Sequence, residues 1–343
     1  MRRVRDRRTV TQAFLLVATL MMVAAVMDKS LQAQGVRRGI GPRKNPPIPP
    51  DETVLPSETD GEIRTFDYPQ AVYHPRQTAR NQLVILLPGT NGKGPTGLER
   101  LSINAANLGY HVITPMYPND IAATSCQHDE DPDAFAKFRW AIIEGGSSSH
   151  LKGAISRAES IENRIIKLLK YLQRKHADQS WGQFLNGDQI VWEKVVIGGM
   201  SQGGGHAALI ATRRLVARVL CFGAPKDYNL RLGAPAAWYG KSETPPTRYF
   251  AFNNTHDRQG CDYRQEVEIL NKLGVAQVAG IANVDAEPRP YHGARVLFTN
   301  WPGPGSSIAS INAHTSVIDD GPWAGSAPLF RPVWLYMLSS SVS

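Results

Sequence analysis

Apolar runs alternate with amphipathic patterns along most of the chain after residue 70. The apolar runs predict strands at 71–74, 82–87, 110–116, 194–199, 218–223, 248–252 and 295–300, and the amphipathic stretches predict helices at 97–107, 154–175, 202–213, 263–273 and 327–339. Runs such as "LVILL" at 83–87 are apolar throughout, which is typical of strands buried on both faces. This order predicts an α/β fold with a mostly parallel sheet and helices on both faces.

The stretch 154–175 has the clearest helical period. Its apolar positions recur every three or four residues, at Ile161, Ile165, Leu168, Leu169 and Leu172. Such spacing places them on one helix face. We interpret them as core residues without a functional role.

The first 62 residues lack this alternation. "MRRVRDRR" precedes an apolar run at 13–27, which is shorter than the roughly 20 residues needed to span a bilayer. The pattern predicts a signal peptide at 1–33 and a secreted or periplasmic protein; the alternative is a retained leader that tethers the chain to a membrane. Residues 35–58 contain six prolines, so 34–62 is predicted to be an extended linker before a folded domain at 63–343.

Composition restricts the classes of partner. The chain has 343 residues, 42% of them hydrophobic, which allows one large domain or two smaller ones. The formal net charge of +8 falls to +4 without residues 1–33, which hold six Lys or Arg and two Asp. Because no basic patch interleaved with aromatic residues follows, no nucleic-acid partner is expected.

The three cysteines differ in their surroundings. Cys221 lies in the apolar run "ARVLCFGAP", where a buried free thiol is expected. Cys126 and Cys261 lie in polar segments, and they are the preferred pair for a disulfide in an exported protein.

The segment "VVIGGMSQGGGH" at 195–206 places Ser201 between a predicted strand and a predicted helix. G-x-S-x-G in this setting predicts a nucleophile elbow, where the serine occupies a sharp, strained turn and flanking glycines avoid steric collisions. The alternative is a glycine-rich turn that binds phosphate at a helix N-terminus. Neither a dinucleotide fingerprint nor a P-loop can be completed from this sequence, which favours the elbow.

A serine nucleophile requires a histidine base and an orienting carboxylate, in the chain order Ser, acid, His. Four histidines follow Ser201: His206, His256, His292 and His314. His206 lies on the helix after the serine, where packing or hydrogen bonding is expected. His292 precedes the strand at 295–300, whereas His314 follows that strand in a predicted loop. We therefore predict His314 as the base.

Two aspartates compete for the role of the acid. Asp257 follows the strand at 248–252, and Asp227 follows the strand at 218–223. We favour Asp257, because the strand that it follows is the one before the helix at 263–273 and the last strand at 295–300. For the oxyanion, "LPGTNG" offers the backbone N–H of Thr90, or of Asn91, to act together with that of Gln202.

The segments "GMSQGG", "LPGTNG", "NNTHD" and "NAHTS" together resemble the α/β-hydrolase superfamily of esterase and lipase type, over residues 70–340. The resemblance implies a sheet of about eight strands without a large lid domain. It also implies Ser201 as nucleophile, Asp257 as acid and His314 as base, with no metal and no cofactor. The chain departs from the family in two places, with Pro88 before Gly89 where esterases often have histidine, and with Met200 before the serine.

These features predict a serine hydrolase acting on a small-molecule or polymeric ester. A peptidase or an acyltransferase on the same scaffold is one alternative, and a binding protein without turnover is another. The acidic cluster "HDEDPD" at 128–133 lacks the glycine and the glutamate of a calcium loop, so a solvated loop is expected there. The sequence leaves the oligomeric state open.

Overall fold

A computed structural model describes residues 49–95, 97–302, 310–318 and 330–342. The signal peptide predicted at 1–33 lies outside these ranges, as does most of the predicted linker. Within the described part of the chain, no helix combines the length and the apolar character needed to cross a membrane.

Nine strands form the main sheet. They are β1 (Glu52–Val54), β2 (Gln70–Tyr73), β3 (Leu83–Leu87), β4 (His111–Thr114), β7 (Val195–Met200), β8 (Arg218–Phe222), β11 (Tyr249–Asn254), β12 (Ile281–Asn283) and β13 (Val296–Thr299). Their order is β1-β2-β4-β3-β7-β8-β11-β13-β12. β2 pairs antiparallel with both β1 and β4, and every other pair is parallel. Two small two-stranded sheets join β5 (Leu185–Asn186) to β6 (Gln189–Ile190) and β9 (Tyr228–Asn229) to β10 (Ala234–Pro235).

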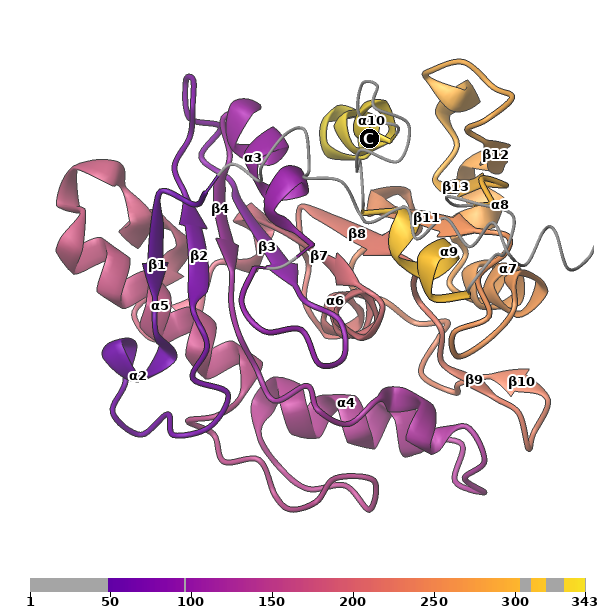
Figure 1. Cartoon of the computed structure of the whole chain (residues 1–343), viewed down its shortest axis with the longest axis horizontal. Helices are drawn as coiled ribbons and strands as arrows, with labels where there is room; N and C mark the ends of the chain where they lie inside the picture. The colour runs from indigo at the N-terminus through magenta and orange to yellow at the C-terminus, as the bar shows by residue number, and fades with distance from the viewer. Residues whose placement is uncertain (1–48, 96, 303–309, 319–329, 343) are drawn as a thin grey trace, which may run out of the picture. The chain divides into compact units, whose positions relative to one another are not determined.

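The α-helices are α2 (Pro56–Thr59), α3 (Glu99–Asn107), α4 (Ala134–Glu144), α5 (Ile161–Lys175), α6 (Gln202–Arg213), α7 (Tyr263–Lys272), α8 (Val275–Ala279), α9 (Ser310–Ser316) and α10 (Arg331–Ser339). Short 3₁₀ turns lie at Ala123–Cys126, Ala177–Gln179, Trp181–Phe184, Trp192–Lys194, Pro246–Arg248 and Tyr291–Gly293. Figure 1 shows α4 on one side of the sheet and α10 on the other.

Two buried clusters fill the two faces of the sheet. In β3, Ile85 packs with residues of α4, α5 and α6, whereas its neighbours Val84 and Leu86 pack with residues of α3 and α10. Successive side chains of a strand point to opposite faces, so a strand covered by helices on both faces must be apolar throughout. The predicted α/β fold, a mostly parallel sheet with helices on both faces, is therefore confirmed.

Several element boundaries differ from the sequence-based expectation. Residues 52–54 form β1 and residues 56–59 form α2, so the folded unit begins inside the predicted linker rather than at Ile63. The sheet has nine strands rather than about eight, and two of them, β1 and β12, were not predicted from the sequence. The predicted helix at 154–175 begins only at Ile161, since the Ser160 side chain accepts a hydrogen bond from the backbone N–H of Asn163 and caps the helix there.

Two helices change the surroundings of the predicted site. α4 lies between the predicted strand at 110–116 and the predicted helix at 154–175, where no helix was expected. α9 contains His314, which was expected in a loop. Residues 327–329 of the last predicted helix lie outside the described ranges, and α10 begins at Arg331.

No lid domain lies between β8 and β11, a stretch that is described throughout. Residues 223–248 there contain only the β9–β10 pair and one 3₁₀ turn.

Candidate active site

Ser201 occupies the turn between β7 and α6. Its backbone angles are φ 54° and ψ −116°, a conformation that costs a non-glycine residue about 1–3 kcal/mol. Its backbone N–H donates to the carbonyl oxygen of Phe222 at the end of β8, at 2.8 Å. Its side chain remains half-buried rather than covered. The turn thus has the strained geometry of a nucleophile elbow, tied to the neighbouring strand.

Glycines on both sides of the serine permit this turn. A Cβ atom on Gly199 would lie 2.4 Å from the carbonyl oxygen of Leu87, and one on Gly203 would lie 2.1 Å from the same atom. Leu87 is the last residue of β3, the strand beside β7. Since two backbone segments converge there, any side chain at either position collides with main chain that cannot move aside.

The loop after β3 approaches the serine closely. A Cβ atom on Gly89 would lie 3.4 Å from the Cβ of Ser201. The Asn119 side chain donates to the carbonyl oxygens of Gly89 and Gly92, at 3.2 Å and 3.1 Å, and fixes the loop. The backbone N–H of Asn91 is engaged, because it donates to the carbonyl oxygen of Asn119 at 2.9 Å. This favours Thr90 over Asn91 as the second oxyanion donor.

Gln202 connects this loop to the start of α6. Its Oε1 accepts from the Thr90 hydroxyl at 3.1 Å and from the backbone N–H of Ala123 at 2.9 Å. Its own backbone N–H lies in the first turn of the helix, where N–H groups have no acceptor within the helix. The Gln202 side chain therefore holds the loop that carries Thr90, the other candidate donor to the oxyanion.

His314 and Asp257 form a buried pair. Nδ1 of His314 lies 2.6 Å from Oδ2 of Asp257, and the two residues are 6% and 1% exposed. A carboxylate only accepts, so Nδ1 carries a proton, and in the neutral imidazole Nε2 then has the lone pair. A Cβ atom on Gly223 would lie 3.2 Å from Cε1 of His314, which places the imidazole beside the residue that follows Phe222. Phe222, the last residue of β8, thus binds the serine backbone, and Gly223 just after it lies beside the histidine.

Asp257 is held in its ionised form. Its Oδ1 accepts from the backbone N–H of Gln259 at 2.7 Å, and its Oδ2 lies 2.9 Å from Nζ of Lys226. Burial raises the pKa of Asp257, but the hydrogen bond from His314 and the charge of Lys226 outweigh it and bring the pKa below its usual value. A charged acid suits a group that orients a histidine and stabilises its protonated form.

Asp227, the other candidate acid, has a different partner. Nε and Nη2 of Arg139 donate to its two carboxylate oxygens at 2.7 Å and 2.6 Å, with both residues buried. Trp238 Nε1 also donates to Oδ2, at 3.0 Å. This aspartate is therefore committed to an ion pair with α4 and is not the partner of His314.

Arg139 was not identified from the sequence, and it stabilises the start of α6. Its Nη1 donates to the carbonyl oxygen of Gln202 at 3.0 Å. A Cβ atom on Gly205 would lie 2.3 Å from Nη2, so this glycine makes room for the guanidinium. A lone arginine inside an apolar helical pattern was the available signal, because such a residue is rarely buried without a partner.

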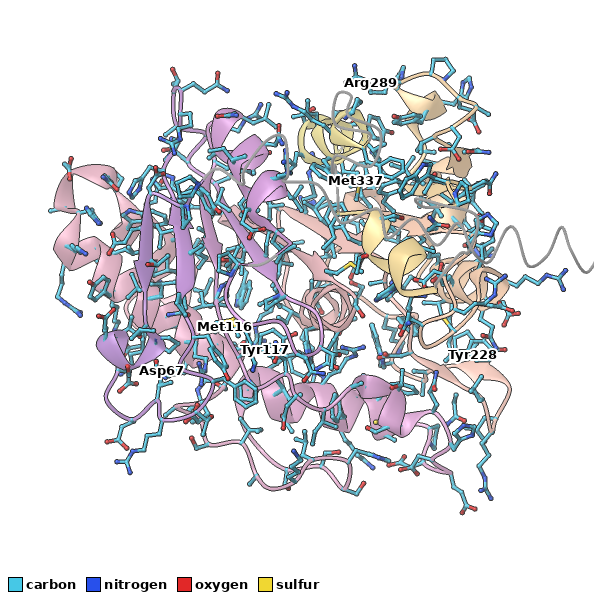
Figure 2. All side chains as sticks on the ribbon, in the orientation of Figure 1. Asp67, Met116, Tyr117, Tyr228, Arg289 and Met337 are labelled. Atoms are coloured by element: carbon cyan, nitrogen blue, oxygen red, sulfur yellow. The ribbon has the colours of Figure 1, made fainter. Side chains whose placement is uncertain are left out.

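The other histidines lie elsewhere. His256 Nε2 is 3.1 Å from the carbonyl oxygen of Asn300, and the His292 side chain is 82% exposed. His206 is fully buried, and its ring packs edge-on against Tyr117 with centroids 5.2 Å apart. Tyr117, labelled in Figure 2, belongs to the cluster between the sheet and α4. Neither ring nitrogen of His206 has a hydrogen-bond partner among the described residues, so it is a packing residue.

The cysteines are unpaired and buried. Cys126, Cys221 and Cys261 are all free, so the expected Cys126–Cys261 disulfide is absent from this structure. Both residues pack in the apolar cluster on the α4 face, which the polar neighbours in the sequence did not indicate. In the ranges that the structure describes, no group of three or more His, Cys, Asp or Glu side chains could hold a metal ion.

Comparison with known proteins gives distant structural matches. The sequence matches no protein-family model and no curated protein. An alpha-beta serine hydrolase homologue from Coxiella burnetii matches with a TM-score of 0.40 and 12% identity, over 74% of this chain and 89% of that one. The propionate-bound esterase Est2 of Thermogutta terrifontis gives 0.38 and 12%, over 73% and 83%. TT1662 of Thermus thermophilus gives 0.38 and 12%, over 84% and 99%. The α/β fold itself is defined by the mostly parallel sheet and the helices on its two faces.

Proposed function

We propose that this protein is a serine hydrolase that cleaves carboxylic esters through an acyl-enzyme. The observation that carries the proposal is the 2.6 Å contact between His314 and Asp257 beside Gly223, at the strand end that also anchors Ser201. The contact and the chain order Ser201, Asp257, His314 support a Ser-Asp-His triad.

The chemistry follows from the roles of these groups. Nε2 of His314 accepts the proton of the Ser201 hydroxyl while Oγ attacks the ester carbonyl carbon. The N–H groups of Gln202 and Thr90 donate to the oxyanion that forms, and loss of one such donor typically costs about 2.7–4 kcal/mol of transition-state stabilisation. His314 then returns the proton to the leaving alcohol and activates a water molecule, which releases the acid.

Covalent labelling tests the nucleophile. A fluorophosphonate should modify the full-length protein at a single peptide that contains Ser201, and Ser201→Ala should abolish the modification. Turnover of short p-nitrophenyl esters should fall by on the order of 10⁶-fold in the same variant. A Ser201→Ala protein with full esterase activity would exclude the triad. A folded wild-type protein that is not labelled would favour a binding protein without turnover.

A panel of substrates separates the alternatives on this scaffold. Ester, anilide and acyl-acceptor substrates distinguish an esterase from a peptidase or an acyltransferase, which would use the same triad. The absence of a lid domain between β8 and β11 favours small or extended esters over substrates that need an enclosed pocket.

Export is a second proposal, supported by the basic and apolar leader at 1–33. N-terminal sequencing of the mature protein tests it. Cleavage near Ala33 supports export, whereas an intact leader on membrane-bound protein supports tethering.

A further inference from the structure

A second pair of charged side chains lies behind the acid of the triad. Lys226 comes from the connection after β8, and Glu266 comes from the first half of α7. The Lys226 side chain is only 10% exposed and Glu266 is fully buried. Nζ of Lys226 contacts both Oδ2 of Asp257, at 2.9 Å, and Oε1 of Glu266. One buried cation is thus shared by two carboxylates.

The position of Lys226 matters because of the atom that it contacts. Oδ2 of Asp257 is also the oxygen that accepts from His314 Nδ1 at 2.6 Å. A positive charge beside this oxygen holds the carboxylate in place, but it also opposes formation of the imidazolium that the reaction requires. Glu266, on the other side of the ammonium group, offsets that charge.

We infer that Lys226 and Glu266 are positioning residues of the triad, and that the charge of Glu266 sets how strongly Lys226 opposes protonation of His314 during catalysis. The inference rests on the proposed function. It concerns groups that do not touch the substrate and act through Asp257.

Of this pair, Glu266 is the residue that changes charge near neutral pH. Burial raises the pKa of Glu266 to about 7, with Lys226 lowering it and Asp257 raising it. The charged or titratable groups around the pair are Asp257, His314, Cys261, Asp262 and Tyr263. Burial raises the pKa of Tyr263 to about 12 and that of Cys261 well above its usual value, so neither changes charge near pH 7.

The sign of the effect follows from these charges. Above pH 7 Glu266 is negative, and together with Asp257 it leaves the buried cluster with an excess negative charge that favours the imidazolium. Below pH 7 Glu266 is neutral, so Lys226 cancels the charge of Asp257. The conservative variant Glu266→Gln reproduces the low-pH state at every pH.

The test is the rate of Ser201 modification by a fluorophosphonate, measured from pH 5.5 to pH 9 on full-length protein. We expect wild type and Glu266→Gln to react equally below pH 6. Above pH 8 wild type should react roughly tenfold faster, the factor that one pKa unit of altered interaction represents. Glu268→Gln, an exposed position on the same helix, is the matched control and should follow wild type throughout.

A double variant separates charge from packing. Lys226→Met combined with Glu266→Gln removes both charges and leaves Asp257 alone, as in wild type at high pH. It should regain most of the rate lost by Glu266→Gln above pH 8. Failure to regain it, or a loss in Glu266→Gln that is the same at every pH, overturns the inference.

A measurement without turnover distinguishes this inference from the proposed function. Nuclear magnetic resonance of labelled histidine should show that His314 takes up its proton at a lower pH in Glu266→Gln than in wild type. If wild type is not modified at Ser201, the proposed function fails, and this titration still tests the pair. An unchanged His314 titration overturns the inference whatever the activity.

Discussion

Asp227 and Asp257 follow neighbouring strands, and their partners assign them different roles. Asp257 faces His314 and Lys226, whereas Asp227 is enclosed by Arg139 and Trp238. Removing the charge of one should therefore affect the reaction, and removing the charge of the other should affect the folded state.

Asp257→Asn should lower kcat by about 10⁴-fold, because the amide no longer fixes the histidine tautomer. Lys226 keeps Glu266 as a partner, so this variant should remain folded. Asp227→Asn leaves the buried Arg139 without its counterion and should lower the free energy of unfolding by about 3–5 kcal/mol. Ester turnover and urea denaturation of both variants check this. The reverse pattern would assign the acid to Asp227.

At the residue scale, the sequence is most informative where a motif is local. The turn at Ser201 follows from five adjacent residues, because the steric demands of an elbow are met within that stretch. The Arg139–Asp227 pair joins residues 88 positions apart, and no local pattern specifies which buried charge meets which. The Lys226–Glu266 pair is likewise formed by buried charges that are distant in the sequence. Position along the chain favoured Asp257 over Asp227 as the acid. Only the structure shows that Asp257 contacts His314 and that Asp227 contacts Arg139.

At the scale of elements, the junction of β3, β7 and α6 has no room for additional atoms. Gly203→Ala would place a methyl group 2.1 Å from the Leu87 carbonyl oxygen, so we expect a loss of about 3 kcal/mol or more in the free energy of unfolding. Gly61→Ala is the control, because no atom lies within 4 Å of the new Cβ. Thermal denaturation compares them; equal melting temperatures would contradict this account of the elbow.

Long apolar strands and helices were predictable, and short or interrupted elements were not. β3 and β7 are apolar throughout and appear where expected. β1 and β12 have three residues each, too few to establish a period. In α4 the apolar positions Phe135, Phe138 and Ile142 have helical spacing, but the buried Arg139 interrupts that face. α9 has seven residues, so its period is equally short.

For the whole molecule, buried neutral histidines predict instability in acid. Burial lowers the pKa of His206 well below 6.5, with the charge of Arg139 adding to the effect, and burial also lowers the pKa values of His74 and His111. Below pH 6.5 the unfolded chain binds protons at these residues that the folded chain does not, so stability present above pH 6.5 is lost as the pH falls.

His206→Phe isolates one of these contributions and keeps a ring against Tyr117. Between pH 6 and pH 5 it should reduce the pH dependence of the free energy of unfolding by about 1.4 kcal/mol per pH unit. Urea denaturation at several pH values measures this slope, with His292→Phe at an exposed position as the control. A slope equal to that of wild type would show that His206 becomes protonated in the folded protein.

The buried thiols have a practical consequence for the chain as a whole. All three cysteines are unbridged, and burial raises the pKa values of Cys126 and Cys221 to about 12. Folding to this structure therefore needs no oxidant, and a reducing cytosol can serve for production as well as an oxidising compartment. Alkylating agents such as iodoacetamide should spare the native protein, so inhibition of ester turnover by a fluorophosphonate but not by an alkylating agent would point to an oxygen nucleophile.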